Sequence, residues 1–230
     1  MRAYGYCERI GDHFWDEPWN AVTNGAFLLA AVAAFVLWRR AGRNDRPALV
    51  LILLVAAIGI GSFLFHTRPQ PWTLAADVIP IQLFAFAYFA LALTRFLGWG
   101  PVATGFGTLA FLAFALSLSG LLAPVLPPLL RGSAGYGAFL LGLAGVAGAL
   151  WRRPGQKATA RLIGLAGLGF AFSLTFRTLD RPLCEVIPLG THWLWHLLNA
   201  TVLYLLLKAA ILQGPARFDG GGRPAPAAIR

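Results

Sequence analysis

The stretch PALVLILLVAAIGIGSFLFH, residues 47–66, contains no Asp, Glu, Lys or Arg and is apolar except for Ser62 and His66. A membrane-spanning helix needs about 20 mostly apolar residues, because the hydrocarbon core is about 30 Å thick and a helix rises about 1.5 Å per residue. The stretch therefore predicts a membrane-spanning helix that ends at His66.

Six further stretches of this kind indicate a polytopic membrane protein. The connections between them are short and rich in Pro, Gly and Arg, which leaves no room for a separate soluble domain. The sixth is the shortest, so it either starts before residue 162, tilts little or leans on its neighbours. We expect one all-α seven-transmembrane helix bundle over residues 1–212, with a disordered cytoplasmic tail at 213–230. The predicted spans are 20–38, 47–66, 74–94, 101–123, 134–151, 162–177 and 192–212.

The charge distribution orients this bundle in the membrane. The formal net charge is +10, and with the N-terminus outside, thirteen of the 19 Lys and Arg residues fall in inner segments. The positive-inside rule expects that pattern when the C-terminus is cytoplasmic. A nucleic-acid-binding face would not alternate in this way, so no nucleic acid is expected as a partner. Most of the 9 acidic residues lie on the outer side, which hints at cation binding there.

The composition also suggests a source and a location. Ala, Gly and Arg are abundant whereas Lys is scarce, as in a high-GC bacterium. We therefore expect an integral protein of a bacterial inner membrane, with its outer end toward the periplasm. No protein partner can be inferred from the sequence.

Three of the 4 histidines fall at outer ends of predicted spans. His192 and His196, in THWLWH, are four residues apart, so a helix would place both imidazoles on one face. His66 ends the second span and Asp77 begins the third, after a short turn. Closure of the bundle would bring all four to one depth, as three nitrogen ligands and one carboxylate. Three protein ligands and a water are typical of a catalytic zinc site.

Other readings of these residues stay open at this point. A membrane histidine can be an interhelical hydrogen-bonding residue, and a HxxxH pair can hold haem, copper or nothing. Ser62 lies one turn before His66 and either points at the metal or bonds back to its own helix carbonyl. His13 lacks this context and is expected to be an exposed loop residue. Cys7 and Cys184 both lie outside and either form a disulfide or remain free thiols.

Three separated motifs resemble the alkaline ceramidase family, which belongs to the membrane-hydrolase superfamily that includes the adiponectin receptors. They are YCER with EPWNAVTN, GIGSFLFH followed by Asp77, and CE with HWLWH. The resemblance implies that the three histidines bind zinc, that Ser62 lies beside it and that Asp77 acts on the attacking water. It also implies a disulfide between Cys7 and Cys184.

The same family carries a calcium site near the N-terminus. Glu8 and Glu17 match its two glutamates, whereas Gly5 and Ile10 stand where the family has acidic and amide ligands. Asp12 and the carbonyl of Tyr6 would then have to complete the set, because calcium takes six to eight oxygens. The alternative is a solvated acidic segment.

The expected function is zinc-dependent hydrolysis of the amide bond of ceramide or a related N-acyl lipid, taken from the bilayer. The products would be a free fatty acid and an amine. The alternatives are a receptor-like or structural seven-helix protein braced by zinc, and a haem or copper electron carrier. A lipid hydrolase would release fatty acid in a zinc-dependent way, and an electron carrier would be coloured.

Overall fold

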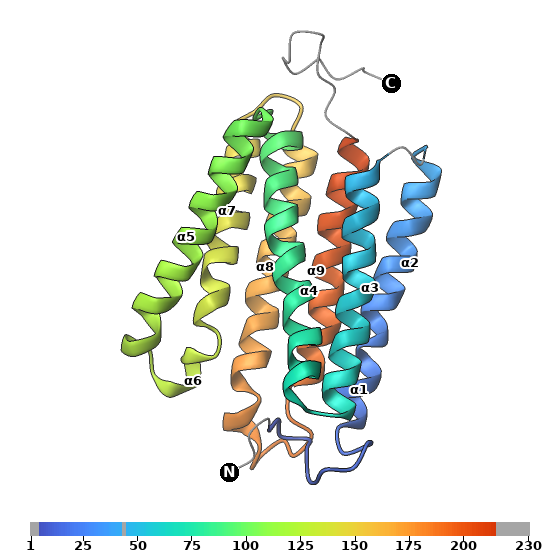
Figure 1. The fold of residues 1–230 in the computed structure, drawn as a ribbon, viewed down its shortest axis with the longest axis vertical. Helices are drawn as coiled ribbons and strands as arrows, with labels where there is room; N and C mark the ends of the chain where they lie inside the picture. Colours follow the sequence, from blue (N-terminus) through green and yellow to red (C-terminus); the bar gives the residue numbers. More distant parts are fainter. Residues whose placement is uncertain (1–4, 43–44, 215–230) are drawn as a thin grey trace.

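The computed structural model describes residues 5–42 and 45–214 of the chain. This part contains helices and no strands, and seven segments are long and apolar enough to cross a membrane. The predicted seven-helix architecture is confirmed (Figure 1). The spans are Pro18–Arg40 (α1, Pro18–Thr23, and α2, Gly25–Arg40), α3 (Arg46–Thr67), Pro71–Phe96 (α4, Pro71–Leu91, and the π-helical turn η1, Ala92–Phe96), α5 (Pro101–Val125), Ala134–Trp151 (η2, Ala134–Tyr136, and α7, Gly137–Trp151), α8 (Lys157–Leu179) and α9 (His192–Gln213).

The sixth span is longer than its apolar stretch. Helix α8 begins at Lys157 and has 23 residues, so the first of the three expected options holds. Lys157 and Arg161 extend the helix because their long side chains can reach the polar surface while the backbone stays helical. The short α6 (Pro128–Arg131) and η3 (Arg181–Leu183) lie in connections. The expected tail falls almost wholly on residues 215–230, which lie outside the described residues.

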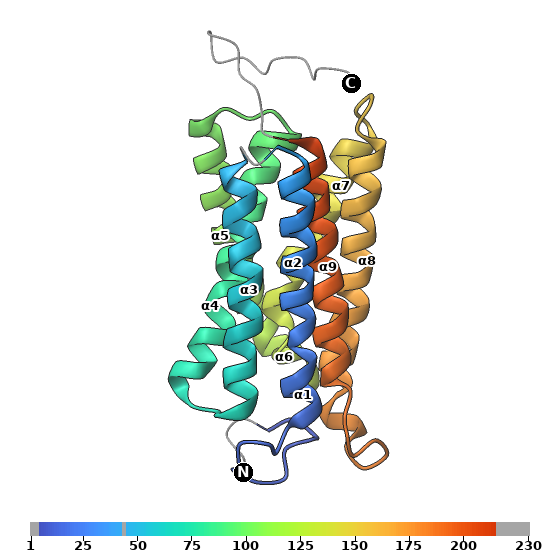
Figure 2. The same cartoon turned by 90° about the vertical axis from the view of Figure 1, so that its right-hand side faces the viewer.

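Consecutive spans pack side by side, and the last closes the ring. Helix α9 packs against α2, α3 and α8, whereas α5 lies at the periphery between α4 and α7 (Figures 1 and 2). The buried core lies between α2, α3, α4, α7, α8 and α9. Closure of α9 against α2 and α3 is what brings the start of α9 beside the end of α3.

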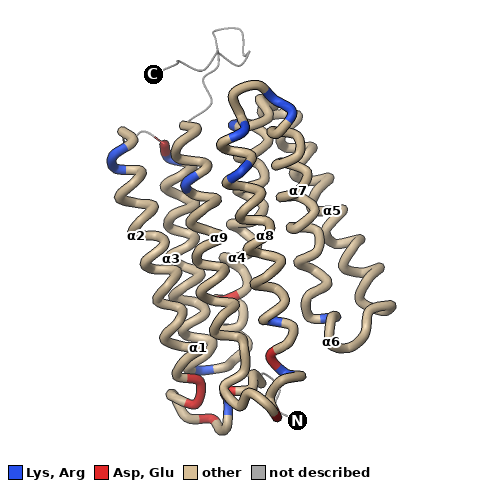
Figure 3. Tube along the Cα trace, turned by 180° about the vertical axis from the view of Figure 1, so that it is seen from behind, with Lys and Arg blue, Asp and Glu red and all other residues tan. Residues whose placement is uncertain are grey.

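The two ends of the bundle differ in charge. Most of the described Lys and Arg positions lie toward the end of the bundle opposite residue 5, and most Asp and Glu positions lie toward the end that carries residue 5 (Figure 3). Asp45 lies at the basic end, where it caps α3 through Ala48 and pairs with Arg95 at 2.7 Å. The structure thus separates the charges as the sequence pattern predicts, while the side of the membrane that each end faces stays a prediction.

A glycine sets the closest approach of α3 to α4. A Cβ atom at Gly61 would overlap the carbonyl oxygen of Ala76, so only glycine lets the two backbones come together here. Ser62 follows Gly61, and Asp77 follows Ala76. The close approach therefore places Ser62 next to Asp77.

Candidate metal centre

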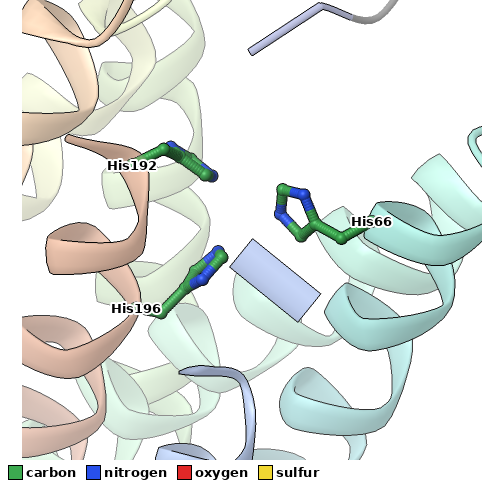
Figure 4. Close-up of side chains that lie close together, drawn as sticks. All are labelled: His66, His192 and His196. Atoms are coloured by element: carbon green, nitrogen blue, oxygen red, sulfur yellow. The ribbon is translucent and has the colours of Figure 1, made fainter. Parts of the chain in front are cut away.

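Three histidines converge at the end of the bundle that carries residue 5. His66 lies in the last turn of α3, and His192 and His196 lie in the first two turns of α9. Their possible ligand nitrogens lie within 4.8 Å of one another, and the residues are 1–3% exposed. The three side chains point toward one another (Figure 4). Among the described residues, this is the group of His, Cys, Asp and Glu side chains placed to share a metal ion.

Glu17 orients the imidazole ring of His66. Its carboxylate also contacts the Arg9 guanidinium, whose positive charge favours the ionised form. The ionised carboxylate can only accept, and it lies 2.5 Å from His66 Nδ1. Nδ1 therefore carries the proton, which leaves the lone pair of Nε2 free to bind a metal.

Thr23 has the same effect on His196. Its hydroxyl donates to the carbonyl oxygen of Trp19 at 2.6 Å, and its oxygen lies 2.9 Å from His196 Nδ1. Because the hydroxyl hydrogen is already committed to Trp19, Nδ1 of His196 donates to Thr23. His196 Nε2 therefore also keeps its lone pair.

One ring nitrogen of each histidine in the cluster has no hydrogen-bond partner among the described residues. They are His66 Nε2, His196 Nε2 and His192 Nδ1, and all are buried. Buried polar atoms without a partner are costly and rare, so three of them in one place call for a shared ligand. Neutral imidazoles oriented by a carboxylate and a hydroxyl are a typical donor set for a transition-metal ion. The residues present therefore fit a metal.

Ser62 and Asp77 lie beside this cluster, where both line the same cavity as His196. Asp77 is not among the described groups close enough to share an ion with the histidines. The structure thus brings the predicted Ser62 and Asp77 together, next to the metal ligands. A carboxylate in this place can accept a proton from a group that reacts near the metal.

A long cavity begins at these groups and runs between α3, α4, α7, α8 and α9. Ser62, Asp77 and His196 line its polar end, and apolar and aromatic side chains line the rest, as far as Ala92 and Leu206. The space without atoms measures about 930 Å³, part of which is open to the surroundings. The helical rise puts Ala92 about 22 Å from Asp77 along the helix. The cavity therefore suits an alkyl chain with a polar group at one end.

Comparison with known protein families agrees with this arrangement. The model of the Ceramidase family matches residues 5–213. The chain belongs to the ceramidase family. Ceramidases are hydrolases that act on the amide bond of ceramide, so this ceramidase-family chain is a membrane hydrolase of that class. A search of the curated proteins finds no match.

The four residues expected to bind calcium are not arranged as a cage in this ceramidase-family protein. Glu8 accepts hydrogen bonds from the main-chain N–H groups of Trp19 and Asn20, at 2.6 and 2.8 Å. Glu17 binds His66 and Arg9, and Asp12 is exposed. Among the described residues, these three carboxylates do not form a group close enough to share one ion, so calcium binding at this segment stays a prediction.

Tyr6 was expected to contribute its carbonyl oxygen, whereas in the structure its ring contacts the histidine cluster. It stacks on His192 with ring centroids 3.8 Å apart and lies 5.1 Å from His66. Tyr6 therefore covers the histidine cluster from the side of the N-terminal segment. Its carbonyl oxygen accepts a hydrogen bond from the Arg9 N–H at 3.2 Å.

Cys7 and Cys184 form a disulfide, with Cα atoms 5.1 Å apart. The bond ties the segment that carries Tyr6 to the connection before α9. His13 is exposed at the surface, as expected.

Sequence reasoning missed several residues that position the cluster. One group of these residues lies on the first span, where Thr23 and Asn24 follow Asn20 by three and four residues. This helical spacing could have been recognised, because polar groups in a membrane helix need partners. Asp180 and Arg9 gave no comparable signal, since charged residues are common at the ends of spans. Arg177 is the last residue of the sixth predicted span, and its guanidinium lies over the rings of Tyr136 and Trp195, which line the cavity.

Proposed function

We propose that the protein is a zinc-dependent amidohydrolase that cleaves ceramide or a related N-acyl lipid to a free fatty acid and an amine. One observation carries the proposal: three buried imidazoles with unpartnered nitrogens lie beside the Ser62–Asp77 pair, at the polar end of an apolar cavity. A metal that only braced the bundle would need neither the cavity nor the carboxylate.

Zinc is the metal that best suits this donor set. Three neutral imidazoles with room for a further ligand are typical of catalytic zinc. His66, His192 and His196 would hold the ion, while Glu17 and Thr23 orient two of the rings. A bound zinc ion would polarise the amide carbonyl and lower the pKa of water.

The side chains next to the histidines supply the proton transfers. Asp77 would accept the proton of the attacking water and pass it to the nitrogen of the leaving amine. The Ser62 hydroxyl would donate a hydrogen bond to the amide oxygen as negative charge develops there. The acyl chain would lie in the apolar cavity, where its burial contributes binding energy and excludes water from the reacting atoms.

The charge distribution supports an orientation for this reaction. With the basic end in the cytoplasm, the metal centre faces the periplasmic side of a bacterial inner membrane. The lipid would reach the cavity from the bilayer.

The proposal is tested with purified protein in detergent and a ceramide that carries a labelled fatty acid. We expect release of labelled fatty acid by the zinc-loaded protein, loss of release after chelation, and recovery when zinc is restored. Hydrolysis at the full rate without zinc would overturn the mechanism. A zinc-loaded protein that releases no fatty acid from any N-acyl lipid would instead support a seven-helix protein braced by zinc.

A further inference from the structure

Arg9 is buried, although it belongs to the segment that precedes the first span. The residue is only 2% exposed, and its Nε contacts the Glu17 carboxylate. Its Nη2 donates to the carbonyl oxygen of His66 at 2.7 Å, and its Nη1 donates to that of Gly11 at 3.4 Å. A charge removed from water is costly unless such partners surround it. Two oxygens from the N-terminal segment and one from the end of α3 therefore surround one fixed cation.

These oxygens are of the kind that calcium selects. Calcium is bound in proteins by carboxylate and carbonyl oxygens, and here one carboxylate oxygen and two carbonyl oxygens each contact a different nitrogen of Arg9. The guanidinium of Arg9 therefore fills the space between these oxygens. A calcium ion beside it would be repelled by the positive charge. The other expected ligands do not offset this repulsion. Glu8 already accepts hydrogen bonds from two main-chain N–H groups, and Asp12 is exposed.

Arg9 is linked to the metal centre through two routes. One oxygen of Glu17 contacts Arg9 and the other contacts His66 Nδ1, so the guanidinium fixes the carboxylate that orients the ring. The second route is the hydrogen bond from Arg9 to the main-chain oxygen of His66 itself. Partners of this kind set the orientation and basicity of a metal-binding histidine.

We propose that Arg9 is a built-in cation that takes the place of calcium in this protein and positions His66 through Glu17, so that the fold and the metal centre need no calcium. Arg9 acts through other residues and is a positioning residue. The lack of a calcium requirement is independent of the proposed function, whereas the positioning of His66 by Arg9 rests on the proposed zinc centre.

The first experiment titrates calcium into the purified protein in calcium-free buffer. Equilibrium dialysis with radioactive calcium and thermal unfolding in detergent are measured, with magnesium as the control salt. We expect no specific calcium binding at millimolar concentration and the same Tm in calcium and in magnesium. Stoichiometric calcium binding, or a Tm raised by calcium alone, would overturn the proposal.

The second experiment compares Arg9→Gln and Arg9→Lys with Arg181→Gln. Arg181 is a matched control because its guanidinium also contacts the N-terminal segment, at the carbonyl of Gly5, but touches neither Glu17 nor His66. Zinc affinity is measured by competition with a colorimetric chelator. We expect binding about tenfold weaker in Arg9→Gln and a partial recovery in Arg9→Lys, which keeps the charge but loses the planar fork. Arg181→Gln should match the unaltered protein.

Equal zinc affinity in Arg9→Gln and the unaltered protein would contradict the positioning role. If Arg9→Gln does not fold, the calcium titration and Arg9→Lys decide the question, since calcium binding or unchanged zinc affinity would each overturn the proposal. A protein that binds no zinc at all would refute the proposed function, and the calcium result would still be decisive for the built-in cation.

Discussion

The carboxylate of Asp180 accepts a hydrogen bond of 2.9 Å from the main-chain N–H of His192. The same oxygen accepts one from the N–H of Thr191 at 2.8 Å, and the other oxygen accepts one from the N–H of Cys7 at 3.0 Å. A negative charge at the N-terminus of a helix is favourable. Asp180 therefore holds the first residue of α9 in place and joins it to the segment that carries Tyr6.

Replacing Asp180 with Asn should destabilise the protein. An amide has one oxygen, so its NH2 group would face the main-chain N–H of either Cys7 or His192, and these two donors cannot bond to each other. A buried donor left without a partner costs about 1–3 kcal/mol. We expect a clearly lower Tm for Asp180→Asn in detergent. Asp12→Asn is the control, since Asp12 is exposed. Equal Tm values for the two variants would show that the cap contributes little.

Replacing Asp77 with Asn should abolish hydrolysis without removing the metal. The amide has nearly the same shape but cannot accept a proton, and such a loss typically lowers the rate by about 10²–10⁴-fold. The fatty-acid release assay gives the rate, and metal analysis of the same sample gives the zinc content. Unchanged turnover would remove Asp77 from the mechanism.

Replacing His196 with Ala should lower the zinc content of the purified protein. The change removes one of three ligand nitrogens within the cluster. His13→Ala is a matched control, because His13 is exposed and far from the cluster in sequence. Metal analysis of both variants beside the unaltered protein decides the point, and equal zinc in all three would undo the site assignment.

Replacing Gly61 with Ala should push α3 away from α4. The new methyl group would overlap the carbonyl oxygen of Ala76, and such overpacking typically costs about 1–3 kcal/mol. We expect a lower Tm and slower hydrolysis, because Ser62 and Asp77 move apart. Gly145→Ala on α7 is the control, since a Cβ there meets nothing within 4 Å. A Gly61→Ala variant as stable and active as Gly145→Ala would contradict the close-approach argument.

Replacing Ala85 with Phe should shorten the lipid chain that the protein accepts. Ala85 lines the cavity about 12 Å from Asp77 along α4, by the helical rise. We expect kcat/KM to fall for long-chain substrates and to change little for short-chain ones. Ala87→Phe on the exposed side of the same helix should leave the preference unchanged. Equal losses for long and short chains would show that the acyl chain lies elsewhere.

The spans and the histidine cluster could be predicted because both depend on local spacing and membrane depth. Twenty apolar residues have few alternatives to a spanning helix, and His192 and His196 share a helical face wherever α9 lies. The helix ends were less predictable. Hydropathy marks the hydrocarbon layer, whereas α8 continues to Lys157, whose side chain can reach the surface.

The contacts around the cluster could not be predicted, because they depend on how the N-terminal segment folds over the ends of the helices. Tyr6 matched a motif as a carbonyl ligand, yet its ring stacks on His192. Glu17 matched the same motif as a calcium ligand, yet Arg9 and His66 take its oxygens. No spacing rule relates these residues, since the partners lie in segments distant in the chain.

The disulfide between Cys7 and Cys184 spans 177 residues of sequence. At about 5–20 residues per second, a ribosome needs roughly nine to thirty-five seconds to add that length. During this interval Cys184 and His192 have not been made, so the Cys7 thiol cannot form its disulfide and the Tyr6 ring cannot stack on His192. The chain has 2 cysteines in all, so no mispaired bond can form within one molecule. The disulfide can therefore form only after α8 and the chain up to Cys184 have been made, so the segment over the histidines is fixed covalently late in synthesis.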